Sequence, residues 1–444
     1  MKEITIIGGG LAGAEAAWQI IKRGGKARLY EMKPERFSAA HKNENLAELV
    51  CSNSFKSVSL ENASGVLKQE MKMLGSLVIE SAENFRVPAG EALAVDREKF
   101  SSYITERLAS LPGLEIVRKE VAELPASGIV IIASGPLTSD ALSKEIERLT
   151  GKERLYFYDA IAPVLFAGSI DMKVAFKKSR YNKGGDDYIN CPMNTYEYER
   201  FYEELIKAET VALREFEEPK FFEGCLPIEE MARRGKETVC YGPMKPVGLI
   251  DPRTSMEPFA VVQLRQENIS GELYGMVGFQ TRLRYPEQER VFRLIPGLEK
   301  AEFAKLGSMH RNTYINSPKL LATDLSLRSN PDILFAGQIT GVEGYMESAA
   351  MGIAAGIFAL LKANDKPALS FPEQSAIGSL LKYVSTEPAG EFAPMSANFG
   401  LLPSLGARHR KKDRKKLLSA RALESMQEFS RGLESSLPSH YPGA

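Results

Sequence analysis

The sequence predicts an α/β protein with a Rossmann-like nucleotide-binding domain, a large inserted α+β domain and a helical C-terminal segment. Three observations support this prediction. The chain opens with a strand, a glycine turn, a helix and a second strand. Another apolar strand with a small-residue turn follows at Ser127–Pro136. A last strand runs into a glycine-rich loop and a small-residue helix within Pro331–Ala363.

The first unit has every part of a dinucleotide-binding fingerprint. Ile4–Ile7 is a short β-branched run, and the glycines after it have G-x-G-x-x-G spacing. Apolar residues at near-helical spacing predict a helix from Leu11 to about Arg23. A second strand is predicted over Ala27–Tyr30, and Glu31 stands at its end. Strand, turn, helix, strand and acid in this order indicate a dinucleotide site.

Each glycine of the turn has its own physical task. Gly8 permits the tight turn, Gly10 lets a pyrophosphate approach the backbone, and Gly13 lets the helix pack against the sheet. The helix N-terminus offers free N–H groups to the phosphates, and Glu31 would accept hydrogen bonds from ribose hydroxyls. The motif alone does not separate FAD from NAD. From this unit we predict contacts with the cofactor by Gly8, Gly9, Gly10, Leu11, Ala12, Gly13 and Glu31.

Two later strands complete the predicted site. The strand within Ser127–Pro136 ends in a turn where Ser134 and Gly135 would face the cofactor. The strand Ile333–Ala336 runs into Gly337 and Gln338, and a helix is predicted from about Glu343. This last element resembles the closing element of flavoproteins, in which the helix N-terminus points at the pyrimidine side of the flavin. The resemblance favours FAD as the tightly bound cofactor.

The segments between these strands predict the domain organisation. We predict a discontinuous FAD-binding domain from residues 1–90, 110–160 and 326–365, an inserted α+β domain at 161–325 and a mainly helical segment at 366–444. Helices are expected at Ser64–Leu74 and Tyr196–Glu217. Antiparallel strands are expected at Phe259–Arg265 and Leu273–Gln280, with a turn between them.

Composition narrows the classes of partner and compartment. Lys and Arg number 57 and Asp and Glu also 57, so a nucleic acid would have to be met by a local basic patch. We find no run of 18 apolar residues and no signal peptide, which predicts a cytoplasmic protein without a membrane partner. The 4 scattered cysteines fit a reducing compartment, and the 4 distant histidines predict no metal site.

Several stretches together resemble one family. They are GGGLAGAEAAWQI, CSNSFKS, FFEGCLPIEEMARRG, MHRNTYINSP and FAGQITGVEGYMESAAMGIAAG. Along nearly the whole chain the sequence resembles the folate- and FAD-dependent tRNA uracil-5-methyltransferases, the TrmFO family. The resemblance implies transfer of a methylene from 5,10-methylenetetrahydrofolate to C5 of the T-loop uridine (U54) of tRNA. It further implies reduction of that methylene to a methyl group with FAD and NAD(P)H, giving 5-methyluridine.

Three other functions remain open at this point. One is that of a related flavoprotein family that modifies wobble uridines in tRNA, whose members are longer. A second is an FAD-dependent NAD(P)H reductase with no RNA substrate. A third is a flavin-stabilised RNA-binding protein without turnover. The choice between NADH and NADPH and the oligomeric state are open as well.

Two cysteines match the functional pair of the family. The resemblance assigns catalytic roles to Cys225 and Cys51, and we take Cys225 as the nucleophile and Cys51 as its partner beside the flavin. Pro227 suits the first position of a helix, which would place Cys225 before a helix N-terminus and lower the pKa of its thiol. The alternative is that both are small buried hydrophobic residues, as we expect for Cys191 and Cys240.

Further candidates lie near the predicted flavin and on the surface. Tyr345 would stack on the flavin, the pterin or the base, or would only close the start of a helix. His310 would contact nicotinamide or folate, or is a core or surface residue, and Glu347 and Ser348 would cap and pack. Basic groups that could hold RNA, or form solvated faces, are Arg408–Lys416, Lys177–Lys183, and Arg282 and Arg284 with Tyr285.

Overall fold

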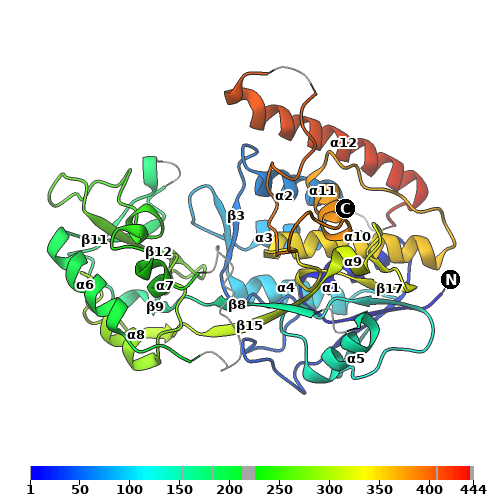
Figure 1. Cartoon of the computed structure of the whole chain (residues 1–444), viewed down its shortest axis with the longest axis horizontal. Helices are drawn as coiled ribbons and strands as arrows, with labels where there is room; N and C mark the ends of the chain where they lie inside the picture. Colours follow the sequence, from blue (N-terminus) through cyan, green and yellow to red (C-terminus); the bar gives the residue numbers. More distant parts are fainter. Residues whose placement is uncertain (1, 152–153, 183–184, 213–225, 407–408, 441–444) are drawn as a thin grey trace.

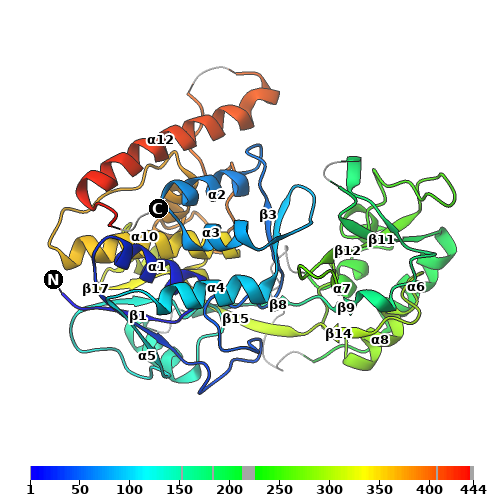
Figure 2. The same cartoon turned by 180° about the vertical axis from the view of Figure 1, so that it is seen from behind.

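The computed structural model describes residues 2–151, 154–182, 185–212, 226–406 and 409–440. Figure 1 shows a larger body that carries both termini and a smaller lobe beside it, and Figure 2 shows the same division from behind. The described parts of residues 161–307 build the smaller lobe around its own sheet. The two parts are joined by a long antiparallel ribbon of β8 (Arg154–Ala160) and β15 (Met309–Ile315).

The larger body is built on a six-stranded sheet with the order β16-β17-β7-β1-β2-β6. All its pairings are parallel except that of β16 with β17. The central strands are buried along their whole length because helices cover both faces, which explains their continuous apolar sequence. The strands are β1 (Ile4–Ile7), β2 (Ala27–Glu31), β6 (Leu114–Arg118), β7 (Ile129–Ile132), β16 (Ser326–Leu327) and β17 (Asn330–Phe335).

Two helices pack on this sheet with their backbones in near contact. They are α1 (Leu11–Lys22), in which every residue is buried, and α10 (Tyr345–Ala363). A Cβ atom on Gly352 would lie 2.2 Å from the carbonyl oxygen of Ala12, so only glycine permits this approach. By length and composition α10 could cross a membrane, but 94% of its most apolar stretch is buried inside the protein. It is therefore the central core helix of the larger body.

The remaining helices of this body form its outer layers (Figures 1 and 2). The carboxylate of Glu70 on α2 accepts the N–H groups of Ala376 and Ile377 at the start of α11, at 2.7 and 2.9 Å. The outer helices are α2 (Ala63–Met73), α3 (Leu77–Asn84), α4 (Arg97–Ala109), α5 (Asp140–Thr150), α9 (Ser317–Leu320), α11 (Ala376–Ser385) and α12 (Arg414–Ser436). A small sheet joins β3 (Ser54–Ser57), β5 (Ala92–Val95) and β4 (Arg86–Val87).

The smaller lobe contains a second six-stranded sheet, which is antiparallel throughout and has the order β10-β11-β12-β13-β9-β14. Its strands are β9 (Val164–Phe166), β10 (Phe176–Lys177), β11 (Tyr188–Met193), β12 (Ala260–Gln266), β13 (Leu273–Met276) and β14 (Phe303–Lys305). The helices α6 (Thr195–Lys207), α7 (Ile228–Arg233) and α8 (Tyr285–Phe292) pack on it.

The α/β fold class and the strands of the first unit are confirmed, but three local predictions were wrong. The helix predicted over Tyr196–Glu217 ends at Lys207, because the chain after it turns extended and Val211 donates its N–H to the carbonyl of Arg282. The strand predicted to reach Gln280 ends at Met276, before a turn at Gly278 with φ +75°. Pro227 precedes α7 as its N-cap and is not its first residue.

Candidate functional site

A cleft crosses the carboxyl ends of the central parallel strands. With the part that is open to solvent it encloses about 1060 Å³. The glycine turn after β1, the end of β2, the turn after β7 and the loop after β17 all line it. Of the residues predicted to bind the cofactor, those that line this cleft are Gly8, Gly9, Gly10, Leu11, Ala12, Glu31, Ser134, Gly135, Gly337, Gln338 and Tyr345.

The glycine turn lines the cleft with main-chain atoms that no side chain covers. Gly8 has φ +106°, and a Cβ atom there would lie 2.5 Å from the carbonyl oxygen of Ala133 on the next strand. A Cβ atom on Gly10 would meet no atom within 4 Å, so this position is open. No side chain caps the start of α1, which leaves its first N–H groups for an anion. Gly13 does not line the cleft, because it packs against the carbonyl of Gly8.

The acid at the end of β2 fixes the turn from the other side. Glu31 is buried, and its Oε2 accepts the N–H of Gly9 at 2.9 Å while Oε1 accepts the N–H of Lys33 at 3.0 Å. Each carboxylate oxygen has a second lone pair, so Glu31 can still accept a hydrogen bond from a ligand hydroxyl. The contact with ribose stays a prediction.

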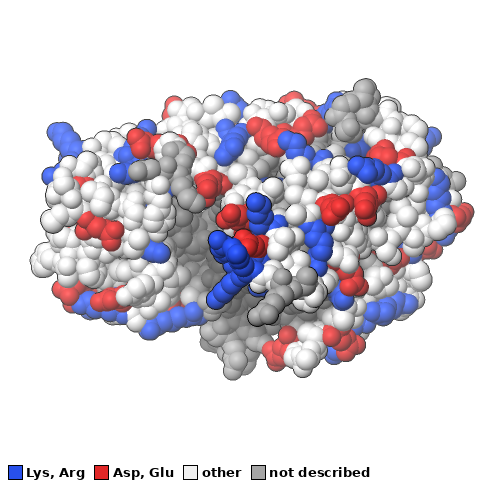
Figure 3. All heavy atoms as spheres, turned by 90° about the horizontal axis from the view of Figure 1, so that it is seen from above, with Lys and Arg blue, Asp and Glu red and all other residues white. Residues whose placement is uncertain are grey.

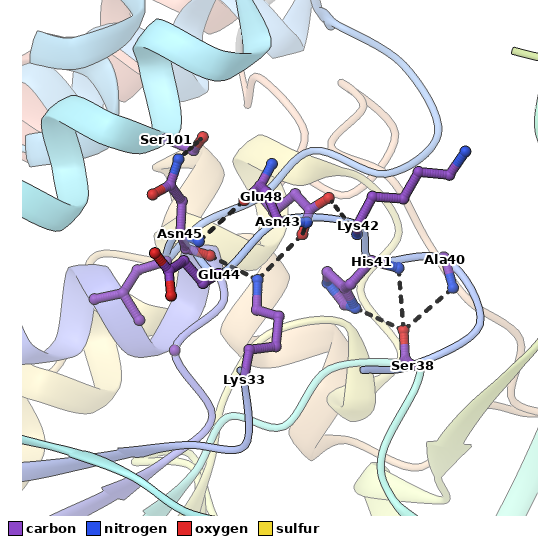
Figure 4. Close-up of polar contacts among 12 residues, drawn as sticks. Lys33, Ser38, Ala40, His41, Lys42, Asn43, Glu44, Asn45, Glu48 and Ser101 are labelled. Carbon is purple, nitrogen blue, oxygen red and sulfur yellow. Dashed lines mark hydrogen bonds and ion pairs between the residues drawn. The ribbon is translucent and has the colours of Figure 1, made fainter. Parts of the chain in front are cut away.

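The loop after β2 forms one wall of the cleft, and Figure 4 shows how its polar groups hold it. The ammonium group of Lys33 donates to the carbonyl of Asn45 at 2.6 Å and pairs with Glu48 at 3.2 Å. Ser38 lies 2.6 Å from Nδ1 of His41, and burial together with the charge of Lys33 lowers the pKa of this histidine. Because Lys33 and Glu48 are both almost fully buried, the wall is fixed in place.

A second cavity lies between the two lobes. With the part that is open to solvent it encloses about 500 Å³, less than the cleft on the same measure, and about 150 Å³ of this space can hold the centre of a water molecule. The larger body contributes Cys51, Ser52 and Arg97, and the smaller lobe contributes the rest. Those residues are Ala162, Pro163, Val164, Arg265, Glu267, Gly275, Met276, Val277, Gly278 and Gln280. Cys51 therefore faces this cavity and is not among the residues that line the cleft.

Cys51 and Tyr345 link the two spaces. Tyr345 lines the cleft, and its hydroxyl lies 2.9 Å from Sγ of Cys51 and accepts the Cys51 N–H at 2.8 Å. Burial raises the pKa of the Cys51 thiol to about 12, and the nearby carboxylate of Asp159 acts in the same direction. At neutral pH Cys51 is therefore a thiol and can donate a proton, whereas an attacking nucleophile has to be a thiolate.

Three cationic side chains brace the segment around Cys51. Lys305 donates to the carbonyl of Val50 at 3.1 Å, and Arg97 donates to the carbonyl of Leu49 at 3.3 Å. Arg265 donates to Oγ of Ser52 at 3.0 Å and to Oδ1 of Asn53 at 2.8 Å. Lys305 and Arg265 belong to the smaller lobe, so this loop is held between the lobes. None of the three residues could be predicted from the sequence, since they are far from Cys51 along the chain.

Cys225 lies outside the described residues, and the chain is described again from Leu226. Two positions further on, the N–H of Ile228 donates to the carbonyl of Gln280 at 2.7 Å. Gln280 lines the second cavity. The segment that follows Cys225 is thus attached to the wall of this cavity.

The other cysteines and His310 lie away from both spaces. Cys191 is fully buried in the core of the smaller lobe, and Cys240 packs against that core. Burial, with the positive charge of Lys305, lowers the pKa of His310 to about 4, so its ring is neutral at pH 7. His310 is not among the residues that line the cleft or the cavity.

Glu347 and Ser348, which follow Tyr345 in the first turn of α10, differ in role. Ser348 lines the cleft. Glu347 is buried, pairs with Lys56 at 3.2 Å and accepts the N–H of Ala397 at 3.1 Å. Glu347 therefore holds the segment at residue 397 against α10, as a packing role requires.

The predicted basic groups are not equally free to meet RNA. Arg282 pairs with Glu230, and Arg284 pairs with Glu209 at 3.0 Å. Arg180 donates to Gln263 and to the carbonyl of Val247. Arg408 and Lys183 lie outside the described residues. The longest exposed run is at the start of α12 and comprises Arg410, Lys411, Lys412, Arg414, Lys415 and Lys416, and Lys177 is exposed as well.

The start of α12 projects beyond the body on the side of the smaller lobe in both Figures 1 and 2. Figure 3 looks at the molecule from above the view of Figure 1 and shows Lys and Arg side chains near the middle of that face. An exposed cationic group of this kind suits a polyanion. We call the six residues Arg410–Lys412 and Arg414–Lys416 the α12 basic group.

Comparison with known proteins shows the family. Residues 3–367 match the family model described as "Glucose inhibited division protein A". The chain is 56% identical over 427 residues to "Methylenetetrahydrofolate--tRNA-(uracil-5-)-methyltransferase TrmFO" of Heliobacterium modesticaldum, covering 96% of this chain and 97% of that protein. It is 57% identical over 428 residues to the protein of the same name from Geobacter sulfurreducens, covering 96% and 98%.

Among solved structures the chain resembles GidA of Aquifex aeolicus. In one crystal form the TM-score is 0.72 at 17% sequence identity, and the match covers 97% of this chain and 73% of that chain. In a second form the TM-score is again 0.72, with 97% and 76% covered. At this identity the likeness shows a common fold.

Proposed function

The chain belongs to the TrmFO family of methylenetetrahydrofolate-dependent tRNA (uracil-5-)-methyltransferases, and we propose that it makes 5-methyluridine in the T-loop of tRNA with electrons from NAD(P)H. The observation that carries this proposal is 53% to 57% identity to proteins of that name along almost the whole chain. The alternatives, a wobble-uridine enzyme, an NAD(P)H reductase and an RNA-binding protein without turnover, are not favoured.

FAD fits the cleft as the bound cofactor. The open position at Gly10 and the uncapped start of α1 suit its diphosphate. Glu31 would hold a ribose, and Ser134 and Gly135 would line the opposite side. Gly337, Gln338 and Tyr345 would lie toward the flavin end. When it is bound, FAD supplies the redox chemistry that turns the transferred carbon into a methyl group.

Two cysteines would act on the uracil ring. We assign the attack on C6 to Cys225, because addition of a thiolate there makes C5 nucleophilic enough to take an electrophilic methylene carbon. Loss of the proton from C5, cleavage of the bond between the methylene carbon and its donor nitrogen, addition of a hydride to that carbon and cleavage of the S–C6 bond would then give 5-methyluracil, with the electrons coming from NAD(P)H. Cys51 suits the role of partner, because its thiol stays protonated and is oriented by the hydroxyl of Tyr345.

The base must leave the folded T-loop to reach these groups, since protein side chains cannot act on a base inside a stack. The α12 basic group would hold RNA phosphates. Folate, NAD(P)H and the T-arm of tRNA are the expected substrates, and a cytoplasmic location stays a prediction.

Mass spectrometry of unmodified tRNA tests the proposal. After incubation with the protein, methylenetetrahydrofolate and NADPH, the T-loop uridine is expected to gain the mass of one CH₂ unit, because a methyl group replaces the hydrogen on C5. Omission of either small substrate should abolish the gain. In the Cys225→Ala protein methylation should be lost, and retained methylation would rule out Cys225 as the nucleophile. Bleaching of the flavin by NADPH without methylation would favour the reductase.

A further inference from the structure

The second cavity has room for a six-membered ring. About 150 Å³ of its space can hold the centre of a water molecule. An engineered cavity of roughly 150 Å³ in another protein binds one benzene molecule. A pyrimidine base is one six-membered ring with small substituents, so it matches this space.

An acceptor without a donor stands in the wall of this cavity. Arg97 contacts Glu267 through Nε and Nη2, at 2.8 and 2.7 Å, and both nitrogens meet the same oxygen, Oε2. The other oxygen, Oε1, is 4.0 Å from Nη2 of Arg265, beyond hydrogen-bond distance. Among the residues that the structure describes, no group donates a hydrogen bond to Oε1.

The side chain of Glu267 is only 6% exposed, and it lines the cavity. Space for it is made by Gly275, because a Cβ atom there would lie 2.3 Å from Oε1. A carboxylate oxygen that has little contact with water and no protein donor gains from a hydrogen bond with a ligand. A ligand that brings an N–H group to Oε1 would supply that bond.

Hydrogen-bond donors stand beside this acceptor. A guanidinium group has five N–H bonds. In Arg97, Nε and Nη2 contact Glu267, and Nη1 donates to the carbonyl of Leu49. One N–H bond on Nη1 and one on Nη2 are then left for a ligand. The wall thus offers an acceptor next to donors. Uracil presents the complementary edge, an N3–H between two carbonyl groups, whereas cytosine has an acceptor at N3 and an amine at C4.

We infer that the second cavity binds the uracil ring of the substrate uridine, with Oε1 of Glu267 accepting the N3–H and Arg97 donating to a neighbouring carbonyl oxygen. The inference rests on the proposed function and extends it to the recognition of the base. Cys51 lies at one wall of the cavity, and Gln280, which holds the segment after Cys225, lies at another. The ring would therefore sit between Cys51 and the wall to which the N–H of Ile228 is bonded.

Binding of three short T-arm RNAs to the FAD-loaded protein tests the inference. They carry uridine, cytidine or N3-methyluridine at the target position. Because a hydrogen bond to a charged group is lost, the Kd for cytidine and for N3-methyluridine RNA should be about 10- to 100-fold higher than for uridine RNA. Equal Kd values for the three RNAs would overturn the inference, and this comparison needs no variant.

Binding of the same RNAs to the Glu267→Gln protein tests the role of Oε1 directly. Arg97 would keep the carbonyl oxygen of the new side chain, so its NH₂ group would face the cavity. The preference between uridine and cytidine RNA should then weaken or reverse. Glu272→Gln, an exposed change on the same hairpin, is the matched control and should keep the preference for uridine. Unaltered preference in Glu267→Gln would contradict the inference.

The same preparation separates this inference from the proposed function. Wild-type protein that methylates uridine RNA but binds all three RNAs equally contradicts only the assignment of the cavity. Wild-type protein that methylates none of them contradicts the proposed function and the inference together.

Discussion

The hydroxyl of Tyr345 lies 2.9 Å from Sγ of Cys51 and accepts the Cys51 N–H at 2.8 Å, so one phenol joins the wall of the cleft to the wall of the second cavity. Tyr345 is the first residue of α10, whose packing on α1 is set by the fold. The ring of Phe55 stands edge-on to Tyr345 at 6.0 Å and limits its movement. Cys51 is thereby positioned by the same helix that closes the cofactor cleft.

Replacement of Tyr345 by Phe should slow methylation while FAD stays bound. The ring is kept, but the Cys51 thiol and N–H lose their partner, so we expect kcat to fall by at least about tenfold. Single-turnover methylation and flavin absorbance measure the two effects. Tyr383→Phe, which removes a hydroxyl that donates to Ala393, is the control and should leave kcat unchanged. Wild-type kcat in Tyr345→Phe would show that the contact is not used.

Two glycine variants should separate cofactor binding from folding. Gly10→Val adds a side chain in open space, so the apoprotein should keep its Tm but bind FAD much more weakly. In Gly13→Ala the new Cβ would lie 1.8 Å from the carbonyl oxygen of Gly8, and overpacking should cost about 1–3 kcal/mol of unfolding free energy. Flavin absorbance and thermal unfolding of both apoproteins check this. Full FAD binding by Gly10→Val would place the diphosphate elsewhere.

Glu70 should make the stability depend on pH. Burial raises its pKa to about 8, against the effect of the two N–H groups of α11. Because the folded pKa is above the unfolded value, the folded state binds the extra proton between about pH 4.5 and 8. The stabilisation is complete below about pH 4.5 and is lost as the pH rises through 8.

Denaturant unfolding at pH 5 and pH 8 measures this effect. The unfolding free energy of the wild type should fall by about 2–5 kcal/mol more than that of Glu70→Gln over this interval. The variant is the control, because it keeps the shape of the side chain without a titrating group. An identical fall in both proteins would show that Glu70 does not titrate there.

The α12 basic group should contribute to RNA binding through charge alone. Lys415→Glu should raise the Kd for tRNA and lower the slope of log Kd against log salt by about 0.7–0.9 or more, because a phosphate contact is lost. Lys144→Glu on α5, which lies at the opposite end of the body in Figures 1 and 2, is the matched control. Equal salt slopes for the two variants would contradict a role for this group.

The sequence predicted the parts of the fold that are local. The glycine turn, α1 and Glu31 are contiguous, so spacing alone located most of the cleft. The end of α6 could not be predicted, because the chain after Lys207 pairs with Arg282 and its neighbours, 71 positions beyond Val211. The ribbon of β8 and β15 was missed for the same reason.

The second cavity was beyond local patterns altogether. Arg97 and Glu267 are 170 positions apart, and neither has a motif of its own. Only the packing of the two lobes places them beside Cys51. The resemblance to a family identified the cysteine but not the residues that surround it.

The source of the methyl carbon tests the account most directly. Unmodified tRNA is incubated with the protein, NADPH and methylenetetrahydrofolate that carries two deuterium atoms on its methylene carbon, and the T-loop nucleoside is analysed by mass spectrometry. We predict 5-methyluridine that retains both deuterium atoms. Unlabelled 5-methyluridine, or unchanged uridine beside a bleached flavin, would contradict the account.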